Sequence, residues 1–112
     1  MEIDFYEKSP DHFPVPDYVQ SLDTKHKKQI RSRFNRLEDL GLERLLYTRD
    51  VKKLRDMGHD IYYLRVIPHR IAFIIQNNTY LMFYGFVKKS KDIPKKHKKN
   101  IINVVETIKN SQ

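Results

Sequence analysis

Three segments in the second half of the chain are dense in β-branched and aromatic residues and lie only a few positions apart. They are residues 61–66, 71–76 and 79–87, and their composition is typical of β-strands. Asn77-Asn78 separates the last two segments, and because asparagine tolerates positive φ, this pair predicts a two-residue hairpin turn. Strands joined by such short turns pair antiparallel. The sequence therefore predicts an antiparallel sheet at the centre of the fold.

Segments with helical patterns precede and follow these strands in the sequence. Pro16 suits the first turn of a short helix that ends at Leu22. The backbone N–H groups of a first turn have no partner within the helix, so the missing N–H of proline costs no hydrogen bond there. Asp23 and Thr24 offer an N-cap for a second helix, whose apolar residues recur at helical intervals: Ile30, Phe34, Leu37 and Leu40. Pro94 opens a last helix, and the same spacing predicts its buried stripe: Ile101, Val104 or Val105, and Ile108.

The remaining segments complete a single domain over residues 1–112. Ile3 and Phe5 alternate with acidic residues and predict a short first strand, whereas residues 42–59 are polar and basic and predict irregular structure. The resulting order is β-α-α-β-β-β-α. It predicts an α+β fold with a small, mostly antiparallel four-stranded sheet and helices on one side of it. A chain of 112 residues can bury one such core but has no room for a second domain.

The charge of the chain narrows the class of partner. Lysine and arginine total 22 against 14 aspartate and glutamate, which gives a net charge of +8 and an isoelectric point near 9.7. The positive electrostatic potential of such a protein favours binding to nucleic acid or to an anionic membrane surface. The alternative is that the excess of lysine only keeps the protein soluble.

Other features exclude whole classes of site. The chain has no cysteine, which excludes disulfides and thiolate-bound metals and is typical of a reducing compartment. Its five histidines show no metal-ligand spacing, so we expect no metal and no cofactor. The N-terminus lacks the pattern of a signal peptide, and no run approaches the roughly 20 apolar residues that span a bilayer. We therefore expect a cytoplasmic protein without a membrane segment.

Strand alternation assigns the polar side chains to faces of the sheet. Tyr62 and Phe73 lie on the more apolar faces of their strands, which we expect to pack on the helices. The opposite face then carries two arginines, a lysine and two tyrosines from three strands: Tyr63, Arg65, Arg70, Tyr84 and Lys88. Such a face can bind phosphates and stack bases. The alternative is that the arginines pair with acidic residues such as Asp60 at the sheet edge.

RNA cleavage needs neither a metal nor a covalent nucleophile, because the 2′-hydroxyl of a nucleotide can attack its own 3′-phosphate. The protein must hold the strand in line, remove the 2′ proton, stabilise the charge on phosphorus and protonate the leaving 5′-oxygen. Arginine suits the phosphate, since its planar fork binds two oxygens and stays charged. The proton-transfer group is left open among His59, Tyr63 and Lys53.

A lysine-rich segment follows the last strand. Seven of the twelve residues from Lys88 to Lys99 are lysines and one is acidic. Lysine binds the backbone of a nucleic acid without reading its sequence. Together with the sheet face, the segment predicts a set of RNA contacts: Lys53, Tyr84, Lys91 and Lys95. The alternative for Lys95–Lys99 is a merely solvated helix face.

These residues also resemble a known family. The matching pieces stand in one order over roughly residues 3–108: Ile3–Ser9, Val51–Leu54, Asp60–Arg65, His69–Ile71, Leu81–Lys89 and Pro94. The set is similar to the HigB-type branch of the RelE/ParE toxin superfamily, in a phage-derived form. The resemblance implies a RelE-like fold and the toxin of a type II toxin–antitoxin pair. Such a toxin cleaves mRNA on the translating ribosome without a metal, and a helix-turn-helix, HigA-like antitoxin neutralises it, with a higher-order toxin–antitoxin assembly as one form of the complex.

The resemblance also assigns catalytic residues. By position, two arginines and one or both of a lysine pair match the family's basic active-site residues: Arg65, Arg70, Lys88 and Lys89. The chain departs from the pattern at Tyr63, where glutamate is usual, and at His69, where an aromatic residue is usual. It has no tyrosine after Tyr84, whereas RelE uses one near its C-terminus. Two other functions stay open: a non-enzymatic inhibitor of a protein target, as in ParE relatives, and an inactive relative that only binds RNA or its antitoxin.

Overall fold

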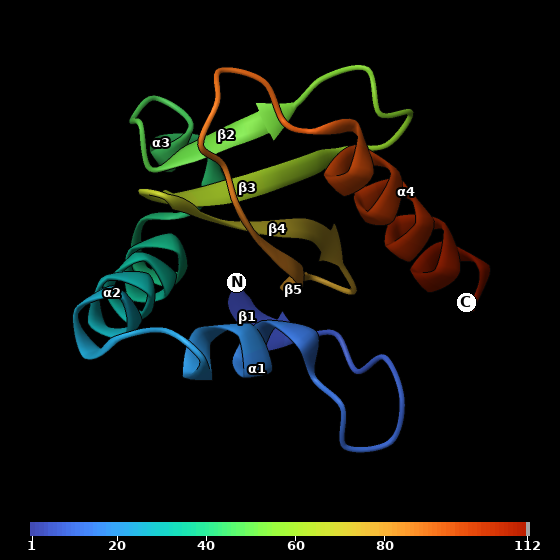
Figure 1. Ribbon diagram of the computed structural model, residues 1–112, viewed down its shortest axis with the longest axis horizontal. Helices are drawn as coiled ribbons and strands as arrows, with labels where there is room; N and C mark the ends of the chain where they lie inside the picture. Colours follow the sequence, from blue (N-terminus) through green and yellow to red (C-terminus); the bar gives the residue numbers. More distant parts are fainter. Residues whose placement is uncertain (112) are drawn as a thin grey trace.

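The computed structural model describes residues 1–111 and forms one five-stranded sheet with helices against both faces (Figure 1). In chain order the elements are β1 (Glu2–Phe5), α1 (Pro14–Gln20), α2 (Thr24–Leu40), α3 (Leu42–Leu45), β2 (Val51–Leu54), β3 (Ile61–Val66), β4 (His69–Gln76), β5 (Thr79–Val87) and α4 (Lys95–Asn110). The α+β class is therefore confirmed.

The sheet has the strand order β1-β5-β4-β3-β2. Strands β2 to β5 pair antiparallel, and β1 adds to β5 in parallel. The predicted hairpin turn is confirmed, because Asn77 and Asn78 have φ values of 50° and 59°. The predicted bounds of β3 and β5 are confirmed as well, whereas β4 begins two residues before the predicted position, at His69.

The prediction of four strands is wrong. The segment 42–59, predicted to be irregular, contains the short helix α3 and the edge strand β2. Strand β2 lies against β3, with Val51 opposite Leu64 and Leu54 opposite Ile61. Val51 and Leu54 are three positions apart, so they face opposite sides of the sheet, and each is buried in a different core. A strand of this kind shows no alternation in its sequence.

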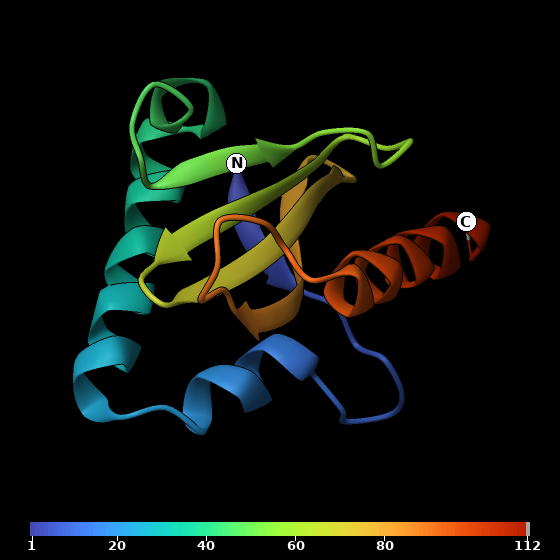
Figure 2. The ribbon, with the colours of Figure 1, turned by 45° about the horizontal axis from the view of Figure 1, so that its top comes forward.

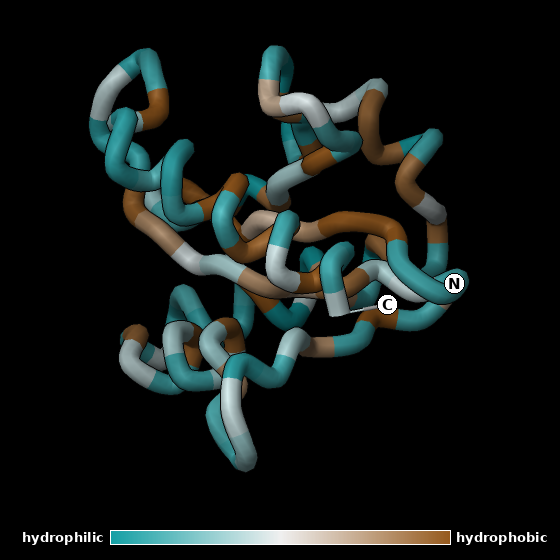
Figure 3. The backbone as a smooth tube through the Cα atoms, turned by 90° about the vertical axis from the view of Figure 1, so that its right-hand side faces the viewer, coloured by the Kyte–Doolittle hydropathy of each residue, from teal (hydrophilic) through white to brown (hydrophobic). Residues whose placement is uncertain are grey.

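The prediction of helices on one side only is also wrong. Helices α1, α2 and α3 cover one face, and α4 covers the other, as the two ribbon views agree (Figures 1 and 2). The first core includes Val15, Ile30, Leu37, Phe73 and Met82. The second includes Ile61, Phe83, Phe86, Ile101 and Val105. The strands are hydrophobic on both faces because both are covered, and brown stretches of the tube accordingly run across the middle of the molecule (Figure 3).

Local signals fix the ends of the helices. The Asp23 carboxylate accepts a hydrogen bond from the backbone N–H of His26 at 2.8 Å and so caps α2, as predicted. Gly41 ends α2 with φ of 86°, a value that side chains disfavour. Pro94 directly precedes α4, whose predicted stripe is buried at Ile101, Val105 and Ile108. Within residues 1–111, no helix is long and apolar enough to cross a membrane.

Candidate functional site

The guanidinium of Arg70 is the most unusual polar group of the fold. Its side chain lies in β4 and the residue is only 6% exposed. Its Nη1 donates to the carbonyl oxygen of His69 at 3.0 Å, while Nε is buried without a hydrogen-bond partner in the described structure. Burial lowers the pKa of Arg70 from its usual value. A buried cation with a free donor is costly unless an anion binds to it.

Other cations surround this group. Arg65 in β3 is the direct cross-strand partner of Arg70. The ring of Tyr63, itself 4% exposed, lies 5.8 Å from Cζ of Arg70 and 6.0 Å from Nζ of Lys88. We call Arg65, Arg70 and Lys88, with Tyr63 between them, the cationic cluster. Like charges on opposed strand positions destabilise a sheet, so an anion bound between them would stabilise this arrangement.

No acidic residue neutralises the cationic cluster. Within residues 1–111, no carboxylate lies within 4.0 Å of a side-chain nitrogen of Arg65, Arg70 or Lys88. Asp60, named above as a partner for the arginines, binds Lys53 instead, at 3.0 Å. The hydrogen bond to Asp60 raises the pKa of Lys53. Lys53 therefore stays protonated and is a poor proton acceptor.

A cavity of about 270 Å³ opens beside the cationic cluster. Its lining comes from β2, the segment between β2 and β3, β3, the segment between β5 and α4, and α4 itself. It contains Tyr63 and five cationic residues: Lys53, Arg55, Lys88, Lys91 and Lys98. Asp56 and Asp92 also line it. The segment between β5 and α4 crosses in front of β3 and β4 in both ribbon views (Figures 1 and 2). The cavity is therefore a basic hollow of a size that suits a phosphate group or a small part of a nucleotide.

Not every predicted site residue reaches this place. Lys89 and Lys95 are exposed nearby in sequence, after β5 and at the start of α4. His59 precedes β3, whereas Arg65 lies near the other end of that strand, roughly 13 Å further on at about 3.3 Å per residue from Ile61. The structure does not bring His59 to the cationic cluster. Tyr84 is on the same side of the sheet, but its hydroxyl faces α4.

The sequence of the chain also matches a known protein family. The model of the family described as "Phage derived protein Gp49-like (DUF891)" matches residues 17–106, which contain the whole cationic cluster. The chain belongs to the Gp49-like family. This family is of the RelE/HigB-like toxin type, so the predicted resemblance is confirmed at that level. No curated protein matches the chain.

The Gp49-like chain has a polar network that the sequence analysis missed. His97 in α4 shares a hydrogen bond of 2.7 Å between its Nδ1 and the hydroxyl of Tyr84. Asn100 Nδ2 donates to the same hydroxyl oxygen at 3.1 Å. The His97 ring also packs on Phe86, with centroids 5.1 Å apart. A signal was present, because His97 stands four residues before Ile101 and so continues the buried stripe of α4.

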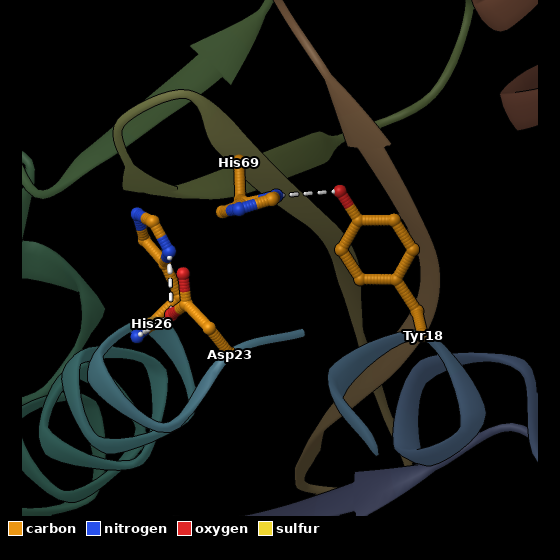
Figure 4. Close-up of polar contacts among 4 residues, drawn as sticks. All are labelled: Tyr18, Asp23, His26 and His69. Carbon is orange, nitrogen blue, oxygen red and sulfur yellow. Dashed lines mark hydrogen bonds and ion pairs between the residues drawn. The ribbon is translucent and has the colours of Figure 1, made fainter. Parts of the chain in front are cut away.

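A second group of titratable side chains lies on the other face of the sheet, under α1 and α2 (Figure 4). The Tyr18 hydroxyl and His69 Nδ1 are 2.8 Å apart, and His26 Nδ1 is 2.9 Å from the Asp23 carboxylate. The two imidazole rings meet edge to face at 4.8 Å. We call these four residues the histidine cluster. Burial, and then the nearby His26, lower the pKa of His69.

The histidine cluster fixes the strand that carries Arg70 in this Gp49-like protein. The His69 carbonyl accepts the hydrogen bond from Arg70, and the His69 side chain is held from the opposite face by Tyr18. His69 thus lies in β4 and is buried. Among the described residues, no group of three metal-ligating side chains forms a metal site.

Proposed function

We propose that this protein is the toxin of a type II toxin–antitoxin pair and that it cleaves mRNA on the ribosome as a metal-free endoribonuclease. The Gp49-like family type supports the toxin assignment. One observation carries the reaction: the Arg70 guanidinium is buried and lacks a counter-ion, beside further cations on the same sheet face.

The cationic cluster suits the phosphate of the cleaved bond. The 2′-oxygen attacks phosphorus, and negative charge grows on the non-bridging oxygens in the transition state. Arg70 and Arg65 donate to these oxygens, and Lys88 adds a third positive charge. Because Arg70 is shielded from water, its interaction with the growing charge is stronger than that of an exposed arginine. No step of this reaction requires a metal ion.

Lysines at the cavity and near it in sequence hold the rest of the RNA strand. Lys53, Lys91 and Lys95 bind backbone phosphates on either side of the cleaved bond, and Lys89 adds to the positive field. These contacts do not read the sequence, so the ribosome supplies the position of the mRNA. A helix-turn-helix, HigA-like antitoxin encoded by a neighbouring gene neutralises the cytoplasmic toxin, within a toxin–antitoxin complex that can assemble further.

The test is induction of the protein in cells with mapping of mRNA 5′ ends. We expect growth arrest and new cuts within translated reading frames. Arg70→Ala lowers cleavage by about 100-fold, the usual cost of losing a donor to a transition-state oxyanion. Arg44→Ala is the matched control, because it removes the same charge from an exposed position in α3 and leaves cleavage unchanged. Equal melting temperatures of the two variants separate lost chemistry from lost folding.

Other outcomes contradict the proposal in distinct ways. Induction without growth arrest and without new cuts rules out the nuclease. RNA binding without toxicity identifies an inactive relative. DNA-damage signalling that persists in Arg65→Ala plus Arg70→Ala identifies a ParE-like inhibitor of a protein target.

A further inference from the structure

His97 lies close to the place where the phosphate binds in the proposed function. Helix α4 crosses the sheet face that carries Arg70, and the His97 ring packs on Phe86 at 5.1 Å. Phe86 is the direct cross-strand partner of Arg70. Side chains of such partners are neighbours, with Cβ atoms about 5 Å apart. The Phe86 ring therefore contacts the imidazole and is also a cross-strand neighbour of the Arg70 side chain.

The hydrogen bonds of His97 determine which of its ring nitrogens is available for proton transfer. Its Nδ1 faces the Tyr84 hydroxyl at 2.7 Å, which leaves Nε2 as the other functional nitrogen of the ring. Asn100 donates to the same phenolic oxygen and holds it in place. When Nδ1–H donates to Tyr84, Nε2 carries a lone pair and can accept a proton. The imidazolium that forms keeps the same Nδ1–H bond to Tyr84, so the ring gains a proton without rearranging.

The surroundings keep this imidazole neutral in the free protein. Burial and the positive charge of Lys96 both lower the pKa of His97. Tyr84 from β5 and Lys96 from α4 are the titratable groups that face it. A neutral imidazole is the form that accepts a proton.

We propose that His97 is a catalytic residue that takes the 2′-hydroxyl proton, with Tyr84 and Asn100 as positioning residues. This inference rests on the endoribonuclease function proposed above. The 2′-proton moves to His97 Nε2 while the 2′-oxygen forms its bond to phosphorus. The bond from phosphorus to the 5′-oxygen breaks, and that oxygen takes a proton from water. The products are a 2′,3′-cyclic phosphate and a free 5′-hydroxyl, and the imidazolium returns its proton to water.

The first test is the pH dependence of single-turnover cleavage on ribosomes programmed with a short mRNA. For the wild type, the rate rises with pH through the pKa of His97 and then levels off. His97→Gln lowers the plateau by about 100-fold, in the range of general base catalysis, and removes this rise. Tyr84→Phe keeps the ring but loses the hydroxyl, and shifts the rise to a different pH. His12→Gln, a histidine exposed before α1, leaves rate and profile unchanged.

The second test does not depend on cleavage. The His97 imidazole is titrated by NMR, with and without an RNA trinucleotide that carries a 2′-deoxy sugar at the cleaved position. A phosphate bound beside Nε2 raises the pKa of His97 by charge attraction. A residue with only a structural role shows no such rise.

The outcomes separate the two proposals. If the wild type cleaves and His97→Gln cleaves at a similar rate with the same profile, His97 is not catalytic although the nuclease stands. A wild-type rate that falls with rising pH also overturns the role as a base. If the wild type itself makes no cuts on ribosomes, the nuclease fails and the role of His97 fails with it.

Discussion

Gly85 is the most closely packed of the three glycines, and a single methyl group there tests how the sheet and α1 are joined. A Cβ at this position would lie 2.5 Å and 2.6 Å from two carbons of the Tyr18 ring. The φ of Gly85 lies outside the left-handed region. The cost of Gly85→Ala therefore comes from the clash and not from backbone strain.

The magnitude of this cost follows from what Tyr18 must give up. Forcing extra volume into a packed site costs about 1–3 kcal/mol. Moving the Tyr18 ring also breaks its hydrogen bond to His69, which is worth about 1 kcal/mol. We expect Gly85→Ala to lower the free energy of unfolding by about 2–4 kcal/mol. In urea, this loss lowers the unfolding midpoint by about 1–2 M.

The assay is equilibrium urea unfolding of a double-mutant cycle. Tyr18→Ala removes the clashing ring, so its combination with Gly85→Ala costs at least about 1 kcal/mol less than the sum of the two single changes. Gly58→Ala is the control, because Gly58 has φ of 74° and open space around it. It carries backbone strain without a clash and costs about 1 kcal/mol. An unchanged midpoint for Gly85→Ala, or additivity in the cycle, refutes the reasoning.

Three further predictions concern pH, packing and salt. The pKa of buried His69 is lowered, so near pH 6 this histidine binds more protons in the unfolded chain than in the folded protein. The stability that neutral His69 contributes is therefore complete above about pH 6.5 and is lost as the pH falls. Thermal melts at pH 7 and pH 5 measure this loss of stability, and His69→Gln makes it smaller. The charged and titratable groups that face the His69 ring are Tyr18, Asp23, His26 and Arg70. Ile101→Ala, at a fully buried position of α4, costs about 2–5 kcal/mol in urea unfolding, well above the cost of the half-buried Val104→Ala. Neutralising Lys95 and Lys99 together weakens RNA binding and flattens its salt dependence by about two counterions, and a collapse of the cleavage step itself would show that these lysines do more than attract RNA.

The sequence predicted best the elements whose signals are local. The meander from β3 to β5 follows from three strand patterns and two short turns, and Asp23 and Pro94 mark the starts of two helices within one or two residues. Strand β2 could not be found in this way. It reads Val-Lys-Lys-Leu, with its apolar residues three positions apart, and it is a strand only because β3 offers it a partner.

The site was predictable only where it depends on the meander. Arg65 and Arg70 were placed together because the hairpin fixes their register. The burial of Arg70 was not foreseen, because it depends on tertiary packing around β4 and not on a local pattern. The contact between Tyr18 and His69 spans 51 positions, and no local pattern reports it. His97 was within reach of sequence reasoning, through the spacing of α4, but its lysine-rich neighbours favoured a solvated helix face.

The parallel pairing of β1 with β5 has a consequence for how the chain reaches its active form. Glu2 at the start of the chain is paired with Thr79, so the first strand to be synthesised waits for the fifth before it has a partner. Contacts of this separation slow folding, because a long loop must close before they form. The second core waits longer still, since α4 is the last element of the described chain to be made. A nascent chain therefore carries Arg65 and Arg70 before it has the helix that packs on the same face of the sheet. The two faces of the sheet are covered at different times during synthesis, and the face that carries the cationic cluster is covered second.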